Sequence, residues 1–233
     1  MKRLLLISAS TVFGTRYLEH AFAELTDLLG KTTRVLFIPY ALKDRDGYAG
    51  RARAAFAEMG YELESIHQQP DPAAALNKAQ AIFVGGGNTF RLLKAIYDEH
   101  LLELFRSRVL EGMPYSGASA GSNLACPTIR TTNDMPIVEP PSLAALNLVP
   151  FQINPHYIDS DPSSTHMGET RETRIQQFHE ENTLPVVGLR EGAMLRVDDN
   201  RVQLRGQAGA RIFRQGQPPV EVKPGTDIEG YLS

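Results

Sequence analysis

The sequence predicts an α/β fold with a mostly parallel, doubly wound sheet, helices on both faces, and antiparallel edge hairpins near the C-terminus. Short apolar runs alternate with helical patterns up to Leu189, as in chains of repeated βα units. Several of these runs are apolar at successive positions, which is typical of central parallel strands covered by helices on both faces. After Leu189 the runs become short and alternating, a pattern that predicts hairpins.

The predicted strands and helices follow one another in a βα rhythm. The strand candidates are residues 3–8, 34–40, 61–66, 81–87, 114–119 and 185–189. The helix candidates are residues 16–29, 49–59, 89–100, 101–111 and 169–181. Residues 193–206 contain two alternating runs joined by an Asp-Asp-Asn turn, and the stretch ARIFRQGQPPVEV follows them. We expect both stretches to form antiparallel hairpins at one edge of the sheet.

The composition is that of a folded globular chain. Its 233 residues are 42% hydrophobic and 22% charged, with a formal net charge of -3, and no linker or repeat interrupts them. We therefore expect one α/β domain over residues 1–233. The basic residues are scattered, which argues against nucleic acid or a membrane as partner, so we expect a peptide or other small substrate. We also expect a monomer or homodimer.

The N-terminus does not have the pattern of a signal peptide. Lys2 and Arg3 precede an apolar run, but residues 4–7 are too few for the roughly 7 to 15 apolar residues that a signal peptide needs. The single cysteine, Cys126, excludes an intrachain disulfide and a Cys-rich zinc site. These features together predict a cytoplasmic protein.

The loops after the parallel strands are where chemistry is expected, because ligands bind at the carboxyl ends of such strands. Four loops qualify, and their sequences are SAST, GGGNTF, GASAGSN and REG. Ser119, in the third loop, ends a strand and precedes a helix start, so it is a candidate nucleophile on a strained strand-to-helix turn. The Ala120 amide would then face a developing oxyanion. The alternative is a small-residue turn that only packs tightly.

The glycine loop at residues 85–87 fits neither a dinucleotide-binding nor a Walker pattern, because Asn88 and Thr89 follow it. We interpret it as a loop whose backbone amides supply the other half of an oxyanion hole, with Thr89 capping the next helix. A plain tight turn is the alternative.

Among the six histidines, His156 is the candidate general base, because it follows an apolar run and a proline and so lies at a strand end. The others are His20, His67, His100, His166 and His179. Two acids could orient His156. Glu191 lies in the same row of loops, whereas Asp134 would give another chain order or form an Asx-turn before Pro136. Cys126 is interpreted as a small buried residue.

Four stretches of the chain closely resemble the peptidase E family of α-aspartyl dipeptidases. They are SAGSNLACPTIRTTNDMPIV, GGGNTFRLL, QINPH and GETRETRI. These serine peptidases have a fold related to the class I glutamine amidotransferases, and the resemblance runs from about Leu4 to Val197. It implies hydrolysis of dipeptides that begin with aspartate, without a metal or cofactor.

By this resemblance Ser119 is the nucleophile and His156 its base, with Glu191 or Asp134 as the third member. The implied oxyanion donors are the amides of Gly86, Gly87, Asn88 and Ala120. Specificity for aspartate also requires a cation for the substrate carboxylate, preferably an arginine that can bind it through two hydrogen bonds. The candidates are Arg171, Arg130 and Arg174, with Arg171 preferred, although each could be an ordinary surface arginine.

Two other functions are compatible with these motifs. A cyanophycinase-like serine peptidase would cleave β-linked aspartyl substrates, but the compact length and the NDMP segment favour peptidase E. A ligand-binding domain on the same scaffold would lack catalysis, and the co-occurrence of Ser119, His156 and an acid counts against it.

Overall fold

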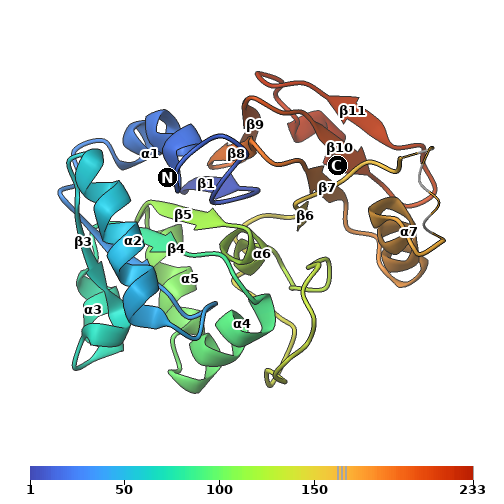
Figure 1. The fold of residues 1–233 in the computed structure, drawn as a ribbon. Helices are drawn as coiled ribbons and strands as arrows, with labels where there is room; N and C mark the ends of the chain where they lie inside the picture. The colour runs from blue at the N-terminus through green and yellow to red at the C-terminus, as the bar shows by residue number, and fades with distance from the viewer. Residues whose placement is uncertain (162, 164, 166, 233) are drawn as a thin grey trace.

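Two sheets organise the computed structural model, which describes residues 1–161, 163, 165 and 167–232 (Figure 1). The larger sheet has the strand order β3-β2-β4-β5-β1-β8-β9, and the smaller sheet has the order β11-β10-β7-β6. In the larger sheet the first five strands of the chain are parallel, and β8 and β9 are antiparallel additions. In the smaller sheet β6 and β7 are parallel, and β10 and β11 are antiparallel.

The strands are short, and most of their residues are buried. Their bounds are β1 (Arg3–Ile7), β2 (Arg34–Ile38), β3 (Glu62–Ser65), β4 (Ile82–Val84), β5 (Tyr115–Ala118), β6 (Gln152–Pro155), β7 (Val186–Leu189), β8 (Ala193–Asp198), β9 (Arg201–Gly206), β10 (Ala210–Phe213) and β11 (Val220–Val222).

Most helices lie between strands of the chain. Their bounds are α1 (Phe22–Leu29), α2 (Arg45–Glu58), α3 (Pro72–Lys78), α4 (Thr89–Asp98), α5 (Leu102–Leu110), α6 (Ala120–Ala125) and α7 (Arg171–Glu181), with short 3-10 turns at Glu19–Ala21, Ile66–Gln68 and Glu229–Tyr231. Within the described part of the chain, no helix has the length and apolar character needed to cross a membrane.

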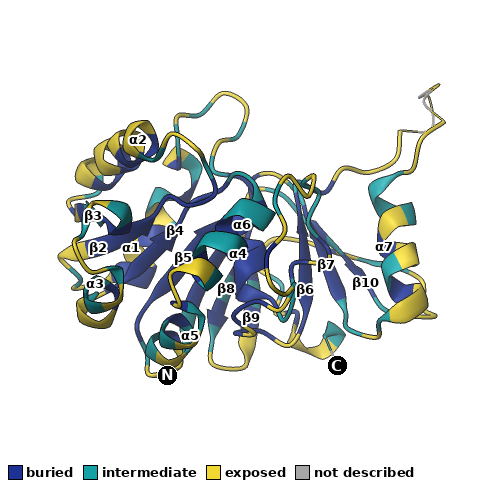
Figure 2. Cartoon of the chain, turned by 90° about the horizontal axis from the view of Figure 1, so that it is seen from below, coloured by how far each residue is buried: buried dark blue, intermediate teal, exposed yellow. Residues whose placement is uncertain are grey.

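Helices cover both faces of the larger sheet, because side chains alternate between its faces. Leu5 and Ile7 of β1 pack into a core with α1 and α2, whereas Leu4 and Leu6 pack into a core with α3 to α6. The second core continues to the smaller sheet. Figure 2 shows buried strands between helices whose outer faces are exposed. The predicted mostly parallel sheet with helices on both faces is therefore confirmed.

The prediction of one continuous sheet is wrong for residues 185–189. These residues form β7, which belongs to the smaller sheet. The reason is that β8 pairs antiparallel along the free side of β1, with Ile7 opposite Met194, and so occupies that edge. The hairpin of β8 and β9 thus lies at the edge of the larger sheet, as predicted, while β10 and β11 extend the smaller one.

Helix boundaries differ from the prediction where local groups decide them. Helix α2 begins at Arg45 instead of residue 49, because the side chain of Asp44 accepts a hydrogen bond from the Gly47 amide and caps the helix. Helix α1 begins only at Phe22, because Leu18 adopts a positive φ of 61° that interrupts a helix. Helix α7 begins at Arg171, after Thr170 caps it.

Candidate active site

Ser119 lies at a sharp turn between the end of β5 and the start of α6. Its backbone has φ 52° and ψ -107°, a conformation that costs a non-glycine residue about 1–3 kcal/mol and persists only where the surroundings enforce it. The Ser119 amide donates to the carbonyl of Ile7 on β1, at 2.9 Å. The strained turn therefore holds the Ser119 side chain at the carboxyl end of the larger sheet.

The two glycines that flank Ser119 allow this turn to pack. A Cβ on Gly117 would lie 2.5 Å from the carbonyl of Gly121, and a Cβ on Gly121 would overlap the carbonyl oxygen of Val84 on β4. The hydroxyl of Tyr115 donates to the carbonyl of Gly121 at 2.6 Å. Helix α6 thus sits directly against the sheet, where no larger side chain fits.

His156 joins Ser119 to Glu191. Its Nε2 lies 3.0 Å from Ser119 Oγ, and its Nδ1 lies 2.7 Å from Glu191 Oε1. A carboxylate can only accept a hydrogen bond, so Nδ1 donates to Glu191 and Nε2 is left to accept from the Ser119 hydroxyl. This is the arrangement of a nucleophile, a base and a group that orients the base.

Ser8 binds the backbone of His156 and of Leu189, which lies two residues before Glu191. Its fully buried hydroxyl donates to the carbonyl of Leu189 at 2.7 Å and accepts from the His156 amide at 2.9 Å. His156 has a positive φ of 52°, so a partner for its amide helps to hold an unfavourable backbone conformation. The sequence places the SAST loop at this edge but indicates no role for Ser8. The feature of the sequence that could have indicated a role for Ser8 is its position as a polar residue at the end of an apolar strand.

Asparagine and threonine side chains hold β6 beside the Ser119 turn. Asn123 of α6 and Thr131 both donate to the carbonyl of Ile153, at 2.7 and 2.8 Å. Asn133 donates to the carbonyl of Pro155 at 2.6 Å. The Asn123 bond joins the helix that follows Ser119 to the strand that precedes His156, and the other two bonds join that strand to the loop after the helix.

Asp134 makes no hydrogen bond or ion pair with His156, whose ring nitrogens contact Glu191 and Ser119. Its Oδ2 accepts from the Thr89 amide at 2.7 Å, from the Thr89 hydroxyl at 2.6 Å and from the Thr132 hydroxyl at 3.1 Å. Asp134 therefore binds the first turn of α4. Of the two predicted acids, the structure brings only Glu191 to the imidazole.

The glycine loop offers fewer free amides than predicted. The Asn88 amide donates to the carbonyl of Ala41 at 3.0 Å, which removes it from the expected set of oxyanion donors. Asn88, not Thr89, caps α4, by accepting from the Arg91 amide at 3.0 Å. Burial raises the pKa of Tyr48, and the Tyr17 hydroxyl and the Gly86 backbone oppose that rise. The backbone of Gly86 therefore lies close to Tyr48.

In the part of the chain that the structure describes, the amides of two predicted oxyanion donors, Gly87 and Ala120, are free to bind a substrate. Neither the Gly87 amide nor the Ala120 amide has a hydrogen-bond acceptor among residues 1–161, 163, 165 and 167–232. Gly87 has φ 133°, and a Cβ there would lie 2.7 Å from the carbonyl oxygen of Ala41. Gly86 approaches Ser119 closely, since its Cβ position is 3.2 Å from Ser119 Cβ. The loop and the turn therefore face each other.

The three predicted arginines occupy different positions. Arg171 and Arg174 line a hollow of about 470 Å³ between residues 158–161 and the start of α7, whereas Arg130 is exposed outside it. Arg174 pairs with Glu169 at 3.6 Å. Partial burial and the nearby charge of Arg174 lower the pKa of Arg171, while Asp134 opposes this shift. Arg171 thus lies within electrostatic range of Asp134.

The remaining sequence candidates lie away from this chemistry. Cys126 is fully buried, and burial raises its pKa to about 12. His67 contacts Ser65 and Asp46, and His179 contacts the carbonyl of Leu184. His166 lies outside the described residues. Among the residues that are described, no group of three or more His, Cys, Asp or Glu side chains has the arrangement of a metal site.

Comparison with known proteins identifies similar chains. Residues 4–205 match the model of peptidase family S51. The sequence is 54% identical over 229 residues to peptidase E of Streptomyces coelicolor, which covers 98% of this chain and 94% of that protein. It is 47% identical over 234 residues to a Drosophila melanogaster protein named "Probable alpha-aspartyl dipeptidase", covering 99% and 98% of the two chains.

A solved structure shows a similar fold. The crystal structure of a peptidase from an acI-B1 actinobacterium superposes with a TM-score of 0.71 at 17% sequence identity, covering 98% of this chain and 96% of that chain. At this identity the likeness concerns the fold alone.

Gly121→Ala tests the close packing of the Ser119 turn. Alanine favours a helix over glycine by about 1 kcal/mol, but overlap with the β4 backbone typically costs about 1–3 kcal/mol. We expect a lower free energy of unfolding in chemical denaturation. Gly50→Ala in α2 is the matched control, because open space surrounds Gly50, and it should stabilise the protein by up to about 1 kcal/mol. Equal stabilisation by both substitutions would contradict the packing argument.

Proposed function

The chain belongs to peptidase family S51, and on this premise we propose that it is a serine-type dipeptidase that hydrolyses dipeptides with an N-terminal aspartate. One observation carries the proposal: the Ser119 hydroxyl is 3.0 Å from His156 Nε2, and His156 Nδ1 is 2.7 Å from Glu191. The relatives named peptidase E and alpha-aspartyl dipeptidase supply the substrate class.

In the proposed reaction His156 takes the proton of Ser119 as the hydroxyl attacks the scissile carbonyl. Glu191 orients the imidazole and stabilises the imidazolium that forms. The amides of Gly87 and Ala120 hold the oxyanion, and loss of one such donor typically costs about 10²-fold or more in kcat. His156 then protonates the leaving amine, and water hydrolyses the aspartyl-enzyme.

Arg171 is the proposed partner of the substrate's aspartate side chain. It lines the hollow between residues 158–161 and the start of α7, and it makes no ion pair with any residue of 1–161, 163, 165 or 167–232. Arg174 is partly neutralised by Glu169, and Arg130 is outside the hollow. A guanidinium can bind a carboxylate through two parallel hydrogen bonds, which suits recognition of aspartate.

We further propose that the enzyme acts in the cytoplasm as a monomer or homodimer. The single cysteine supports this location because it is buried and free, and oxidising compartments favour proteins with disulfides.

A substrate panel tests the proposed specificity. We expect cleavage of Asp-Leu, and no cleavage of Glu-Leu, Asn-Leu, N-acetyl-Asp-Leu or a β-aspartyl dipeptide. Ser119→Ala should abolish the Asp-Leu activity while the protein remains folded, as measured by product chromatography and circular dichroism. Cleavage of the β-linked dipeptide alone would indicate a cyanophycinase-like enzyme, and cleavage of none would indicate a binding module.

Separate replacement of the two acids tests which one orients His156. Glu191→Gln should lower kcat for Asp-Leu by about 10³- to 10⁴-fold, because the imidazole loses its orienting carboxylate. Asp134→Asn should act mainly on KM, since Asp134 contacts the start of α4 and lies near Arg171. The reverse pattern in steady-state kinetics would assign the orienting role to Asp134.

Replacement of Arg171 tests the recognition of the aspartate side chain. Arg171→Met should raise KM for Asp-Leu about 10²-fold, since the substrate carboxylate loses a partly buried charged partner. Arg130→Met and Arg174→Met are the comparison variants, and each should raise KM less. A larger effect at either position would move the recognition role away from Arg171.

A further inference from the structure

The hydrogen bond between His156 and Glu191 is exposed to solvent. The two side chains are 38% and 51% exposed, and exposed pairs of this kind contribute little to holding a structure together. Their backbones also belong to separate segments, one after β6 and one after β7. Other contacts must therefore keep these segments in register.

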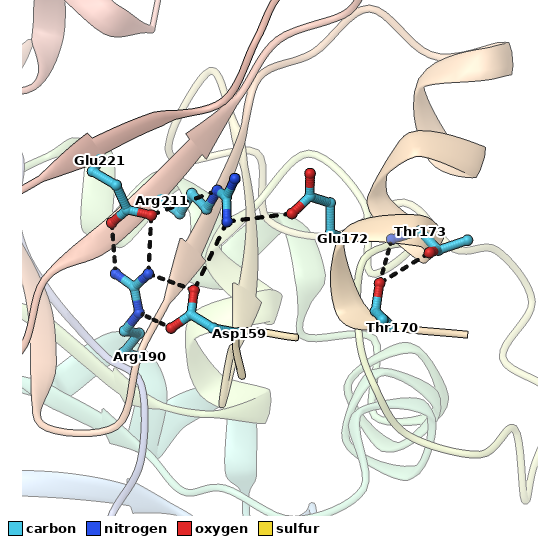
Figure 3. A network of polar contacts seen from close by, with 7 residues as sticks. All are labelled: Asp159, Thr170, Glu172, Thr173, Arg190, Arg211 and Glu221. Atoms are coloured by element: carbon cyan, nitrogen blue, oxygen red, sulfur yellow. Dashed lines mark hydrogen bonds and ion pairs between the residues drawn. The ribbon is translucent and has the colours of Figure 1, made fainter. Parts of the chain in front are cut away.

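A charged network beside the site supplies such contacts (Figure 3). Arg190 donates from Nε and Nη2 to the two carboxylate oxygens of Asp159, at 2.8 and 2.7 Å. It also donates from Nη1 and Nη2 to Glu221, at 3.0 and 3.1 Å. Only 22% of the Arg190 side chain is exposed. Two hydrogen bonds from one guanidinium to each carboxylate fix the relative geometry of the groups, which a single surface ion pair does not.

The Arg190–Asp159 pair joins the two segments that carry Glu191 and His156. Arg190 directly precedes Glu191, and Asp159 follows His156 by three positions in the sequence. Between them, the Tyr157 amide donates to the carbonyl of Leu189 at 3.1 Å. The Arg190 guanidinium also lies 5.6 Å from the centre of the Tyr157 ring. A shift of Arg190 or Asp159 would therefore move Glu191 relative to His156.

A second arm of the network reaches α7. Arg211 on β10 pairs with Glu172 at 3.3 Å and lies 4.0 Å from Asp159. Its Nε is 3.5 Å from Glu221 without hydrogen-bond alignment, so this contact is an ion pair only. Glu172 is the neighbour of Arg171 in the first turn of α7, where Thr170 caps the helix. This arm thus fixes the turn that carries Arg171.

We propose that Arg190 and Arg211 are positioning residues of one network whose two arms govern different steps of the reaction. The Arg190–Asp159 arm holds Glu191 against His156 and so governs kcat. The Arg211–Glu172 arm holds the first turn of α7 and so governs the binding of the substrate carboxylate by Arg171. This inference rests on the proposed dipeptidase function.

The first test places Arg190→Gln in the wild-type background and in the Glu191→Gln background. In the wild type it should lower kcat for Asp-Leu about 10²-fold, the scale of a displacement of about 1 Å in a catalytic group, with KM nearly unchanged. In the Glu191→Gln background it should have no further effect, because the group through which it acts is gone. Glu172→Gln should instead raise KM about tenfold at unchanged kcat.

The control is Arg196→Gln. Arg196 is also largely buried and pairs with two carboxylates, Asp27 and Asp198, but it lies on β8 in the larger sheet. It should lower the melting temperature without changing kcat. If Arg190→Gln does not fold, as judged by circular dichroism, Asp159→Asn is measured in the same two backgrounds with the same expectations.

Three results would overturn the inference. One is an Arg190→Gln enzyme with wild-type kcat, and another is an equal loss of kcat in both backgrounds, as a purely structural role predicts. A third is a Glu172→Gln enzyme with unchanged KM. A wild-type enzyme that does not cleave Asp-Leu would overturn the proposed function itself, and the inference with it.

Discussion

The hydrogen bond between Ser119 and His156 joins residues that follow strands of two different sheets. The geometry of the site therefore depends on how the two sheets are held together. Ser119 ends a strand of the larger sheet, and His156 follows a strand of the smaller one. The buried hydroxyl of Ser8 spans the same boundary, because it binds the carbonyl of Leu189 and the amide of His156. The Asn123 side chain on α6 donates to the carbonyl of Ile153 on β6 and so also joins the two parts of the structure. Neutral hydrogen bonds of this kind contribute about 1 kcal/mol each, but a buried partner left unpaired costs more, so they act chiefly on geometry.

Backbone strain lies at both ends of this bond. Ser119 and His156 each have a positive φ of 52°, which is uncommon for residues other than glycine. Tight packing of Gly117 and Gly121 enforces the first conformation, and the bond from His156 to Ser8 supports the second. The strain aims the hydroxyl and the imidazole at each other. Beyond them, Arg190 makes four hydrogen bonds to Asp159 and Glu221 with a largely buried side chain, whereas the His156–Glu191 contact is exposed.

Features with local signals could be predicted from the sequence, and features that depend on distant pairing could not. The apolar run that ends in small residues placed Ser119 at a strand end, and the motifs around it indicated the family. The smaller sheet was missed because its pairing joins β6, β7 and β10, and no pattern within one strand reveals its partner. The Asn88 amide was misjudged because its acceptor, Ala41, lies in a distant loop. Arg190 and Asp159 resemble ordinary surface charges until the fold brings them together.

The proposed reaction requires that Ser119 attacks the substrate and carries its aspartyl group. The direct measurement is acid quenching of the wild-type enzyme during the first turnover of an α-aspartyl ester, followed by proteolysis and mass spectrometry. We expect one aspartyl group on Ser119, no adduct on the neighbouring Ser116 or Ser122, and loss of the adduct in Ser119→Ala. A burst of leaving group with an unmodified Ser119, or an aspartyl group on any other residue, would contradict it.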